Sequence, residues 1–495
     1  MIRFFFLCFI LSKYSLLFLL TRVGLYKEEP HLLLKHYFED VGGSFIKFGQ
    51  LLSLRVDFLP KEYSLVMLDL LDSVPPFSYE QVKTIFVEEL GATPEKIFFD
   101  FQKEPFASGS FGQVHGAKLT DETILAVKVM RPGIKQQIAT DIFLIKRIAW
   151  IADTFSPIKS ISWSEFAQEF EKWTLDELNY FQEAENATIM REKAKDRKVI
   201  VIPKMYPRFS SARILTQEYI EGVHLSRVLR GIKDGRITVD SLQDSGIDLA
   251  VIPHILAQEV LYQFAIDRFF HGDLHPGNII LLPGNRVALI DFGIVGHALP
   301  RNHDEFITSL KYMGELDIKN AAYHFGNVAG DNIKQIIYSA FPASIKEEDM
   351  QKFLRILTDN YTDQIAGFIG KGRQDLIEMK IDYTTFFLQI VQSAGNYRVH
   401  LPREMSIFVK ALSAMGIVAK ELNPSFRMAT EINYFFSKHP LESFLKDHAE
   451  PPVKRMSRER ALEQLNVWCS QLLENDPKVY KLVSSYISTY NLADT

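Results

Sequence analysis

Two short motifs constrain the fold of this chain more than any other feature: His271–Asn278 (HGDLHPGN) and Ile290–Gly293 (IDFG). Asp273 stands five residues before Asn278 and eighteen before Asp291. Carboxylate and amide oxygens are the ligands that Mg²⁺ prefers, and the residues between Asn278 and Asp291 are typical of a β-hairpin that would bring the two together. The spacing therefore predicts a phosphoryl-transfer site in which Asp273 faces the acceptor while Asn278 and Asp291 hold Mg²⁺.

A block upstream fits the glycine loop of kinases, G-x-G-x-x-G-x-V, with alanine in place of the first glycine. Small residues in such a loop let backbone N–H groups approach phosphates closely. Leu125–Lys128 (LAVK) then supplies the strand lysine of a kinase. A loop of this kind alone is typical of a structural hairpin, but ahead of Lys128 and the two motifs it indicates ATP binding. The expected ATP contacts in this region are Ala107, Gly109, Ser110, Gly112, Val114 and Lys128.

Lys128 needs a carboxylate on a helix to hold it against the phosphates. The acidic run from Ser164 to Asn186 offers several candidates, and it is predicted to be helical. Because Glu at helical spacing is ordinary surface chemistry, most of these charges are expected to form a solvated face. The residue types alone therefore do not single out the partner of Lys128.

The segment Lys47–Pro60 (KFGQLLSLRVDFLP), continuing to Asp72–Pro76 (DSVPP), resembles the K-x-G-Q signature of the UbiB family of atypical kinases, also called AarF or ADCK proteins. The resemblance runs from about residue 35 to about residue 300 and keeps the family's motif order. It implies a protein-kinase-like fold with an extra N-terminal helical segment over the active site. It also implies a role linked to ubiquinone or other isoprenoid-lipid metabolism at a membrane.

The resemblance also implies two ion pairs. Lys128 would pair with Glu183 in the nucleotide site, and Lys47 would reach Glu177 of the family's E-x-D motif across the cleft. Two departures from the family's pattern stand out. Asn179 replaces the second acid of E-x-D and brings no charge, which puts a metal or lysine role there in doubt. Gly109 stands where the family commonly has alanine, so nucleotide binding is expected to be less restricted.

The predicted fold class is α+β: a bilobal, protein-kinase-like fold with a small β-rich lobe, a larger helical lobe and an N-terminal helical K-x-G-Q extension. Glu218 and Ile220 lie in the predicted hinge, whose backbone would meet adenine. The strands expected last in the small lobe are Ile200–Pro203 and Ile214–Glu218. The expected boundaries are 1–25 for an apolar membrane-associated segment, 26–95 for the extension, 96–222 for the small lobe, 223–449 for the large lobe and 450–495 for a helical tail.

The region after Gly293 bears on the substrate. Residues 294–300 pass directly into a predicted helix near His303, which leaves no room for the Ala-Pro-Glu segment that closes the peptide platform of protein kinases. Three hypotheses stay open. The first is a UbiB-type atypical kinase or ATPase that uses ATP and Mg²⁺, and the second is a small-molecule phosphotransferase of the aminoglycoside or choline kinase type. The third, a catalytically dead scaffold, ranks last because Lys128, Asp273, Asn278 and Asp291 are all present.

Residues 4–20 (FFFLCFILSKYSLLFLL) are almost wholly apolar and have Arg3 and Arg22 at their ends. As a helix they would span about 26 Å, against a hydrocarbon core of ~30 Å, and Lys13 in the middle costs a few kcal/mol unless it reaches the interface. No small-x-small cleavage site follows, which argues against a signal peptide. A membrane-embedded or interfacial helix is favoured over an apolar helix packed on the protein's own surface.

Composition narrows the partners and the compartment. A net charge of −5, without RNA-binding aromatic motifs or zinc-finger spacings, argues against nucleic acid. Cys8 and Cys469 are too few and too distant for a disulfide framework, which suits a reducing compartment. We therefore expect a membrane-associated protein with its catalytic part facing the cytoplasm or an equivalent compartment. Its expected partners are ATP and membrane lipid or isoprenoid-quinone pathway proteins, while the oligomeric state and the phosphoryl acceptor stay open.

Overall fold

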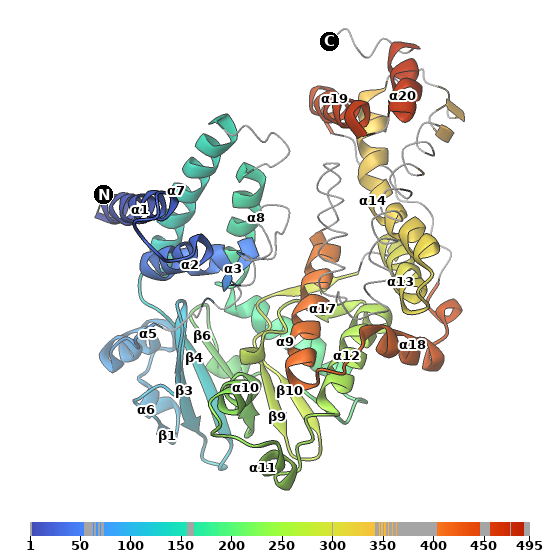
Figure 1. The fold of residues 1–495 in the computed structure, drawn as a ribbon. Coiled ribbons are helices and arrows are strands. Elements are labelled where there is room, and N and C mark those ends of the chain that lie inside the picture. Colours follow the sequence, from blue (N-terminus) through green and yellow to red (C-terminus); the bar gives the residue numbers. More distant parts are fainter. Residues whose placement is uncertain are drawn as a thin grey trace. The chain divides into compact units, whose positions relative to one another are not determined.

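The structure, a computed structural model, describes most of the chain (Figure 1). The described ranges are 2–53, 74–155, 163–298, 300–341, 403–445, 456–475 and 477–489, with residues 63, 66–67 and 70 and a few single or paired positions between 346 and 363. Of the segments named above, Leu54–Pro60 and Asp72–Ser73 of the K-x-G-Q block and residues 450–455, 476 and 490–495 of the predicted tail lie outside these residues. The chain divides into two compact units, Met1–Asp248 with Asp273–Val295, and Leu249–Gly272 with Gly296–Thr495.

A five-stranded antiparallel sheet organises the first unit. Its strands are β1 (Asp100–Phe101), β2 (Ala107–Ser108), β3 (Gly112–Lys118), β4 (Ile124–Met130) and β6 (Ile214–Glu218), in the order β1-β3-β4-β6 with β2 paired to β3. β4 is rich in β-branched and apolar residues and lies between β3 and β6, so most of its side chains are buried. The predicted lysine strand is therefore the central strand beside the glycine loop.

Helix α5 (Tyr79–Leu90) covers one face of this sheet. Ser78 and Gln81 form a capping box at its start, and Gly91 ends it in the left-handed conformation at φ +75°. The helix buries Val82, Ile85 and Phe86 against strand residues that include Leu125 and Val127. A small helix, α6 (Pro94–Ile97), leads from α5 into β1.

A second sheet of four strands carries the hairpin between Asn278 and Asp291. Its order is β5 (Ile200–Val201), β10 (Arg286–Leu289), β9 (Ile279–Leu282) and β7 (Val223–His224). β9 and β10 pair antiparallel in the register Leu282 with Arg286, so the predicted hairpin is confirmed. β5 pairs in parallel with β10, which corrects its expected place in the small-lobe sheet. Helices α10 (Leu225–Lys233) and α11 (Val239–Asp244) follow β7, and the 3-10 turn η3 (Pro276–Asn278) precedes β9.

The helices of the first unit depart from the sequence prediction at two places. Helix α7 (Ile134–Phe155), which was not predicted, packs along α8 (Trp163–Asp176). The predicted single acidic helix is instead two helices, α8 and α9 (Tyr180–Ala194). The chain breaks there because Asn179 adopts a non-helical conformation and its side chain accepts a hydrogen bond from Gln182 N, which starts a new helix.

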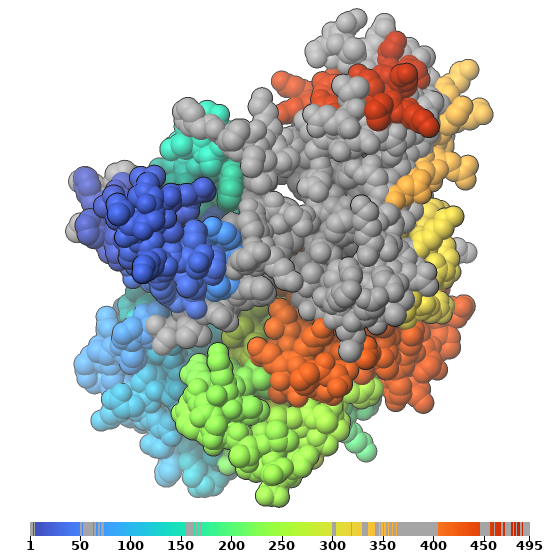
Figure 2. Space-filling model, viewed as in Figure 1, coloured from blue at the N-terminus to red at the C-terminus, as the bar shows by residue number. Residues whose placement is uncertain are grey.

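Helix α1 (Ile2–Arg22) lies against α2 (Pro30–Val41), which is followed by α3 (Ser44–Ser53). The packed stripe of α1 contains the buried Leu7 and Ile10. Polar contacts hold the same helix at two points: Arg3 Nε donates to Asp141 Oδ1 of α7 at 3.0 Å, and Lys13 Nζ lies 2.7 Å from Asp40 Oδ2 of α2. Figure 2 shows α1, in dark blue, on the surface of the protein.

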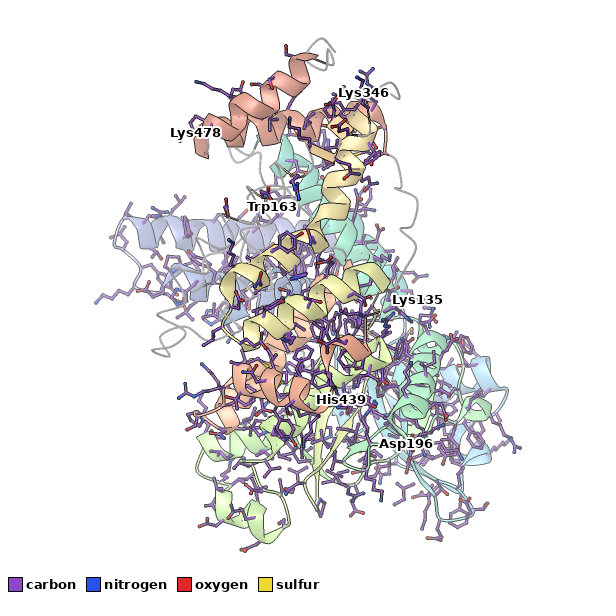
Figure 3. The ribbon with its side chains drawn as sticks, turned by 90° about the vertical axis from the view of Figure 1, so that its right-hand side faces the viewer. Lys135, Trp163, Asp196, Lys346, His439 and Lys478 are labelled. Carbon is purple, nitrogen blue, oxygen red and sulfur yellow. The ribbon has the colours of Figure 1, made fainter. Side chains whose placement is uncertain are left out.

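The second unit is mainly helical. Its helices are α12 (Ile252–Tyr262), α13 (Pro300–Gly314), α14 (Ile318–Ala340), α17 (Arg403–Leu422), α18 (Met428–Lys438), α19 (Arg458–Asn475) and α20 (Pro477–Thr489). A π-helical turn (Gln263–Asp267) and β8 (Phe269–His271) follow α12, so the helical segment ends before Phe269. Phe264 stacks on Phe408 with ring centroids 3.8 Å apart in the core. His439, labelled in Figure 3, follows α18 and packs on Phe435.

Candidate active site

The strand lysine and a helix glutamate form an ion pair at the centre of the first unit. Lys128 of β4 places its Nζ 3.1 Å from Oε1 and 3.0 Å from Oε2 of Glu183 on α9. Glu183 is 3% exposed, so little water competes for its carboxylate. The pair expected from the family resemblance is therefore present, and its bidentate geometry fixes the direction of the ammonium group.

The carboxylate of Asp291 also contacts Lys128. Its Oδ2 lies 3.2 Å from Lys128 Nζ, and its Oδ1 accepts a hydrogen bond from Gly293 N at 3.3 Å. Asp291 has a φ of +65°, a left-handed conformation that is uncommon outside glycine and is enriched at functional sites. Asn186 Nδ2 of α9 donates to Phe292 O at 2.9 Å, which ties the loop after Asp291 to the helix that carries Glu183.

The catalytic-loop residues Asp273 and Asn278 contact each other. Asn278 Nδ2 donates to the backbone oxygen of Asp273 at 3.0 Å. This contact engages the nitrogen of the amide, so the amide oxygen is left to act as a ligand. Asn278 begins the hairpin whose other strand ends just before Asp291, and Ile290 N donates back to Asn278 O at 2.9 Å. The hairpin therefore sets the relative positions of the two predicted metal ligands.

The two candidate ligands, Asn278 and Asp291, suit Mg²⁺ better than they suit a metal ion whose ligands all come from the protein. Within the described ranges, no three or more His, Cys, Asp and Glu side chains gather as a metal site. Mg²⁺ commonly binds through one or two protein oxygens together with phosphate oxygens and water. Asp291 and Asn278 supply one carboxylate and one amide, which is the expected protein share of such a site.

Charges in the cluster do not balance. Three carboxylates, those of Glu177, Glu183 and Asp291, surround the two ammonium groups of Lys47 and Lys128. Burial, opposed by Lys128 and reinforced by Asp291, raises the pKa of Glu183 to about 7. Burial also raises the pKa of Glu177, against the attraction of Lys47. Although burial acts in the same direction on Asp291, Lys128 and Lys47 outweigh it and lower the pKa of that carboxyl, so Asp291 stays negative and a proton that relieves the excess charge binds to a glutamate.

Lys47 brings the N-terminal extension to the cluster. Its Nζ, on α3, lies 3.0 Å from Glu177 Oε2, in the break between α8 and α9. The same ammonium lies 5.3 Å from the ring centroid of Phe111 in the glycine loop. The pairing of Lys47 with Glu177 expected from the resemblance is therefore present, and Lys47 contacts the loop as well.

A further connection between the extension and the glycine loop was not predicted from the sequence. Gln113 Oε1 accepts from Phe77 N at 2.8 Å, and its Nε2 donates to Phe77 O at 3.2 Å. Arg131 Nη2 donates both to Pro75 O at 3.0 Å and to Gly109 O at 3.1 Å. We call these four hydrogen bonds the Gln113–Arg131 latch. The only sequence signal for the latch is that Gln113 belongs to the glycine-loop motif, and this motif does not indicate which residue Gln113 contacts.

The glycine loop is the β2–β3 hairpin, and its predicted residues lie along it. Ala107 pairs with Val114 across the hairpin, and Gly109 N donates to Gly112 O at 2.8 Å. A Cβ at position 112 would stand 2.5 Å from Val129 O, so only glycine fits there. Ser110 is buried within this loop.

The predicted hinge follows β6. Glu218 Oε2 accepts a hydrogen bond from Lys204 N at 3.0 Å and lies 3.7 Å from Arg191 Nη1, so the side chain of Glu218 is engaged in contacts within the protein. Ile220 is half-buried and packs on Ile280 and its neighbours in the second sheet. Any contact with adenine at Glu218 would therefore come from the backbone.

Asn179 has a structural contact in place of the family's acid. Its Oδ1 accepts from Gln182 N at 3.2 Å and caps α9. An Asp at this position would make the same cap, because both residue types are favoured N-caps. The structure therefore accounts for Asn179 through the helix it begins.

A glycine loop over a strand lysine, a helix glutamate paired with that lysine, and a catalytic loop joined by a hairpin to Asp-Phe-Gly together define a protein of the kinase-like class. A family model described as the ABC1 atypical kinase-like domain matches residues 69–325, more than half of the chain. The chain belongs to this family, which includes the UbiB proteins, and the fold is kinase-like. Membership suggests an enzyme of the phosphotransferase type.

Individual relatives agree with this assignment. The chain is 30% identical over 396 residues to an uncharacterized protein in the hydrogenase 1 5′ region of Clostridium pasteurianum, covering 80% of this chain and 68% of that protein. It is 27% identical over 446 residues to the probable protein kinase UbiB of Azotobacter vinelandii, covering 88% and 76%. The uncharacterized protein sll1770 of Synechocystis is 30% identical over 395 residues, and the match spans 78% of this chain but only 61% of that relative's length.

One solved structure is also similar, the complex of Rv3197 with erythromycin from Mycobacterium tuberculosis. The TM-score is 0.49 at 21% sequence identity, and the match covers 82% of this chain and 94% of the other.

Proposed function

We propose that this protein is a UbiB-type atypical kinase or ATPase that binds Mg-ATP and supports ubiquinone or other isoprenoid-lipid metabolism at a membrane. The observation that carries the proposal is the position of Lys128 Nζ between Glu183 and Asp291, at 3.0 Å and 3.2 Å. In a kinase site, such a lysine holds the α- and β-phosphates while the aspartate holds Mg²⁺. Bound Mg²⁺ would supply charge neutralisation at the phosphate oxygens.

Each predicted residue has a role in this proposal. Lys128 contacts phosphate, and Glu183 fixes the direction of its ammonium group. Asp291 and Asn278 bind the metal, while Asp273 faces the acceptor. The loop residues Ala107, Gly109, Ser110, Gly112 and Val114 bring backbone N–H groups to the phosphates, and the backbone at Glu218 and Ile220 meets adenine. Lys47 and Glu177 join the extension to the site.

We propose water or a small lipid-like molecule, in place of a peptide, as the acceptor. The extension supports this choice because Lys47 of α3 reaches Glu177, two residues before the cap of the helix that carries Glu183. A helix at this position takes space that a peptide substrate would need. The same contact favours a UbiB-type enzyme over an aminoglycoside- or choline-kinase type, whose members lack such an extension. We also propose the domain boundaries expected from the sequence, with the extension at 26–95 and the small lobe at 96–222.

We propose that α1 binds a membrane through its exposed face. Phe5–Arg22 is long and apolar enough to cross a bilayer, with a mean hydropathy of 1.6, and only 11% of it is buried. Phe5, Phe9, Leu16 and Leu19 are 65%, 68%, 58% and 61% exposed. A helix held on one side by polar contacts and apolar on the other suits the interfacial arrangement.

Nucleotide turnover tests the proposed function directly. Purified full-length protein is incubated with γ-labelled ATP and Mg²⁺, with and without lipid vesicles, and label is followed into phosphate, lipid and protein. We expect turnover that Asp291→Asn reduces at least about a hundredfold, because losing the metal carboxylate removes several kcal/mol of transition-state stabilisation. Asp196→Asn is the matched control, since Asp196 is exposed in the turn after α9 (Figure 3). Equal rates for wild type and Asp291→Asn would remove the enzyme hypothesis.

A further inference from the structure

Tyr180 carries a buried hydroxyl group that the contacts described above do not use. It is the first residue of α9 and is 1% exposed. Among the residues that the structure describes, its Oη has no hydrogen-bond partner. Folded proteins rarely leave a buried hydroxyl unpaired, because such a group gives up its hydrogen bonds to water. Phenylalanine would fill the same space without leaving a buried hydroxyl unpaired.

The position of this hydroxyl relates it to the glycine loop and to the strand lysine. A Cβ added at Gly112, the last glycine of the loop, would stand 3.0 Å from Tyr180 Oη. Lys128 Nζ lies 5.1 Å from the centroid of the Tyr180 ring. The unpaired donor thus lies beneath the loop and beside the lysine, the two elements that hold phosphates in a kinase site.

We propose that Tyr180 is a phosphate-contacting residue, whose Oη donates a hydrogen bond to a phosphate oxygen of a nucleotide held between the glycine loop and Lys128. This inference rests on the proposed function and adds a donor to it. Contact requires the segment from Ser110 to Gly112, which is folded over the hydroxyl, to lift. Glycines at positions 109 and 112 give that segment the backbone freedom to do so.

The surroundings keep the phenol in its donor form. Burial, opposed by Lys128 and reinforced by Glu183 and Asp291, raises the pKa of Tyr180 well above its usual range. A protonated hydroxyl donates to an anionic oxygen without adding negative charge to a cluster that already has an excess of carboxylates.

The ring and the hydroxyl of Tyr180 have separable roles. The ring contacts Lys128, and phenylalanine would keep that contact. Tyr180→Phe therefore removes only the proposed phosphate donor. Tyr79→Phe is a matched control, because Tyr79 Oη of α5 donates to Glu95 Oε1 of α6 at 2.6 Å, a contact that involves none of the site residues.

The experiment measures dissociation constants for Mg-ADP and for adenosine, and the melting temperature without nucleotide, in full-length wild type and both variants. For Tyr180→Phe we expect ADP affinity to fall about 5- to 20-fold while adenosine affinity stays unchanged, because only ADP carries the phosphates. The melting temperature of this variant is expected to stay the same or rise, since an unpaired buried hydroxyl is removed. Tyr79→Phe should lower the melting temperature and leave both affinities unchanged.

The outcomes separate this inference from the proposed function. If wild type binds Mg-ADP and Tyr180→Phe binds it equally well, the phosphate contact is wrong and the proposed function stands. Equal losses for ADP and adenosine, or a lower melting temperature for Tyr180→Phe, would show that the hydroxyl has a structural role only. If wild type binds neither ligand, both the proposed function and the contact are overturned.

Discussion

Lys47 and Glu177 form an ion pair across 130 positions of the chain, with Nζ 3.0 Å from Oε2 and 3.3 Å from Oε1. Neither side chain is fully exposed, at 25% and 19% of the side-chain surface, so solvent weakens the pair less than it would on an open surface. The N-terminal extension is thereby joined to the carboxylates that surround Lys128. Breaking this pair should change how the site handles nucleotide.

The first prediction is that Lys47→Ala alters nucleotide affinity and lets autophosphorylation appear or rise, because the extension no longer holds its place over the site. Reversing the charge at Glu177 with Lys should act similarly. The double variant should be less than additive, with a coupling on the order of 1 kcal/mol in the free energy of nucleotide binding. Lys83→Ala, which removes an exposed pair on α5, serves as the control. Additive effects across the cycle would show that the two residues do not interact.

The second prediction concerns the Gln113–Arg131 latch. Gln113→Leu leaves the N and O of Phe77 without their partner, so the free energy of unfolding should fall by about 1–3 kcal/mol. Amide hydrogen exchange at residues 107–112 should become faster, because the loop loses one of its connections to the extension. The control is Gln168→Leu on an exposed position of α8. Unchanged exchange in the loop would mean that the latch does not restrain it.

The third prediction tests the exposed face of α1. Replacing Phe9 and Leu16 together with Glu should release the protein from lipid vesicles in a flotation assay, since both side chains are more than half exposed. Nucleotide binding should be unaffected, because both side chains are exposed to solvent and belong to none of the site's contacts described above. Val87→Glu, a 49% exposed position on α5, controls for added negative charge. Wild type that remains unbound to vesicles would rule out the membrane role of this helix.

The fourth prediction follows from the raised pKa of Glu183, about 7 against an ordinary value of 4.5. Between these two pH values the folded chain keeps a proton on Glu183 that the unfolded chain has released. Stability should therefore fall as pH rises through this window, by on the order of 1–3 kcal/mol, and then level off above pH 7. Chemical denaturation from pH 4.5 to pH 8 measures this. Glu183→Gln should flatten the profile, and parallel profiles for the two proteins would contradict the assignment.

Features set by neighbouring residues could be predicted from the sequence. The hairpin between Asn278 and Asp291 formed as expected, because its strands are apolar and its turn is Pro283–Asn285. The lysine strand and the paired helices after residue 457 also agree with their patterns. These elements depend on local propensity and spacing, which the sequence displays directly.

Contacts between distant residues could not be predicted in this way. The parallel pairing of β5 with β10 joins Ile200 to Val287, and nothing local to either strand selects the partner. The same holds for Gln113 and Phe77, 36 positions apart, whose contact is between a side chain and a backbone. The two lysine–glutamate pairs were anticipated only through the family resemblance, because several acids on α8 and α9 have equal claim by charge alone.

At Asn179, the capping of helix α9 and the charge of the side chain are independent of each other. The cap of helix α9 needs a side-chain oxygen that accepts a hydrogen bond, and both the neutral amide of Asn and the charged carboxylate of Asp provide one. A single exchange between amide and acid can therefore move the net charge beside Glu177 by one unit while the backbone stays as it is. The net charge of the cluster around Lys128 can therefore be changed in this fold without changing the path of the backbone.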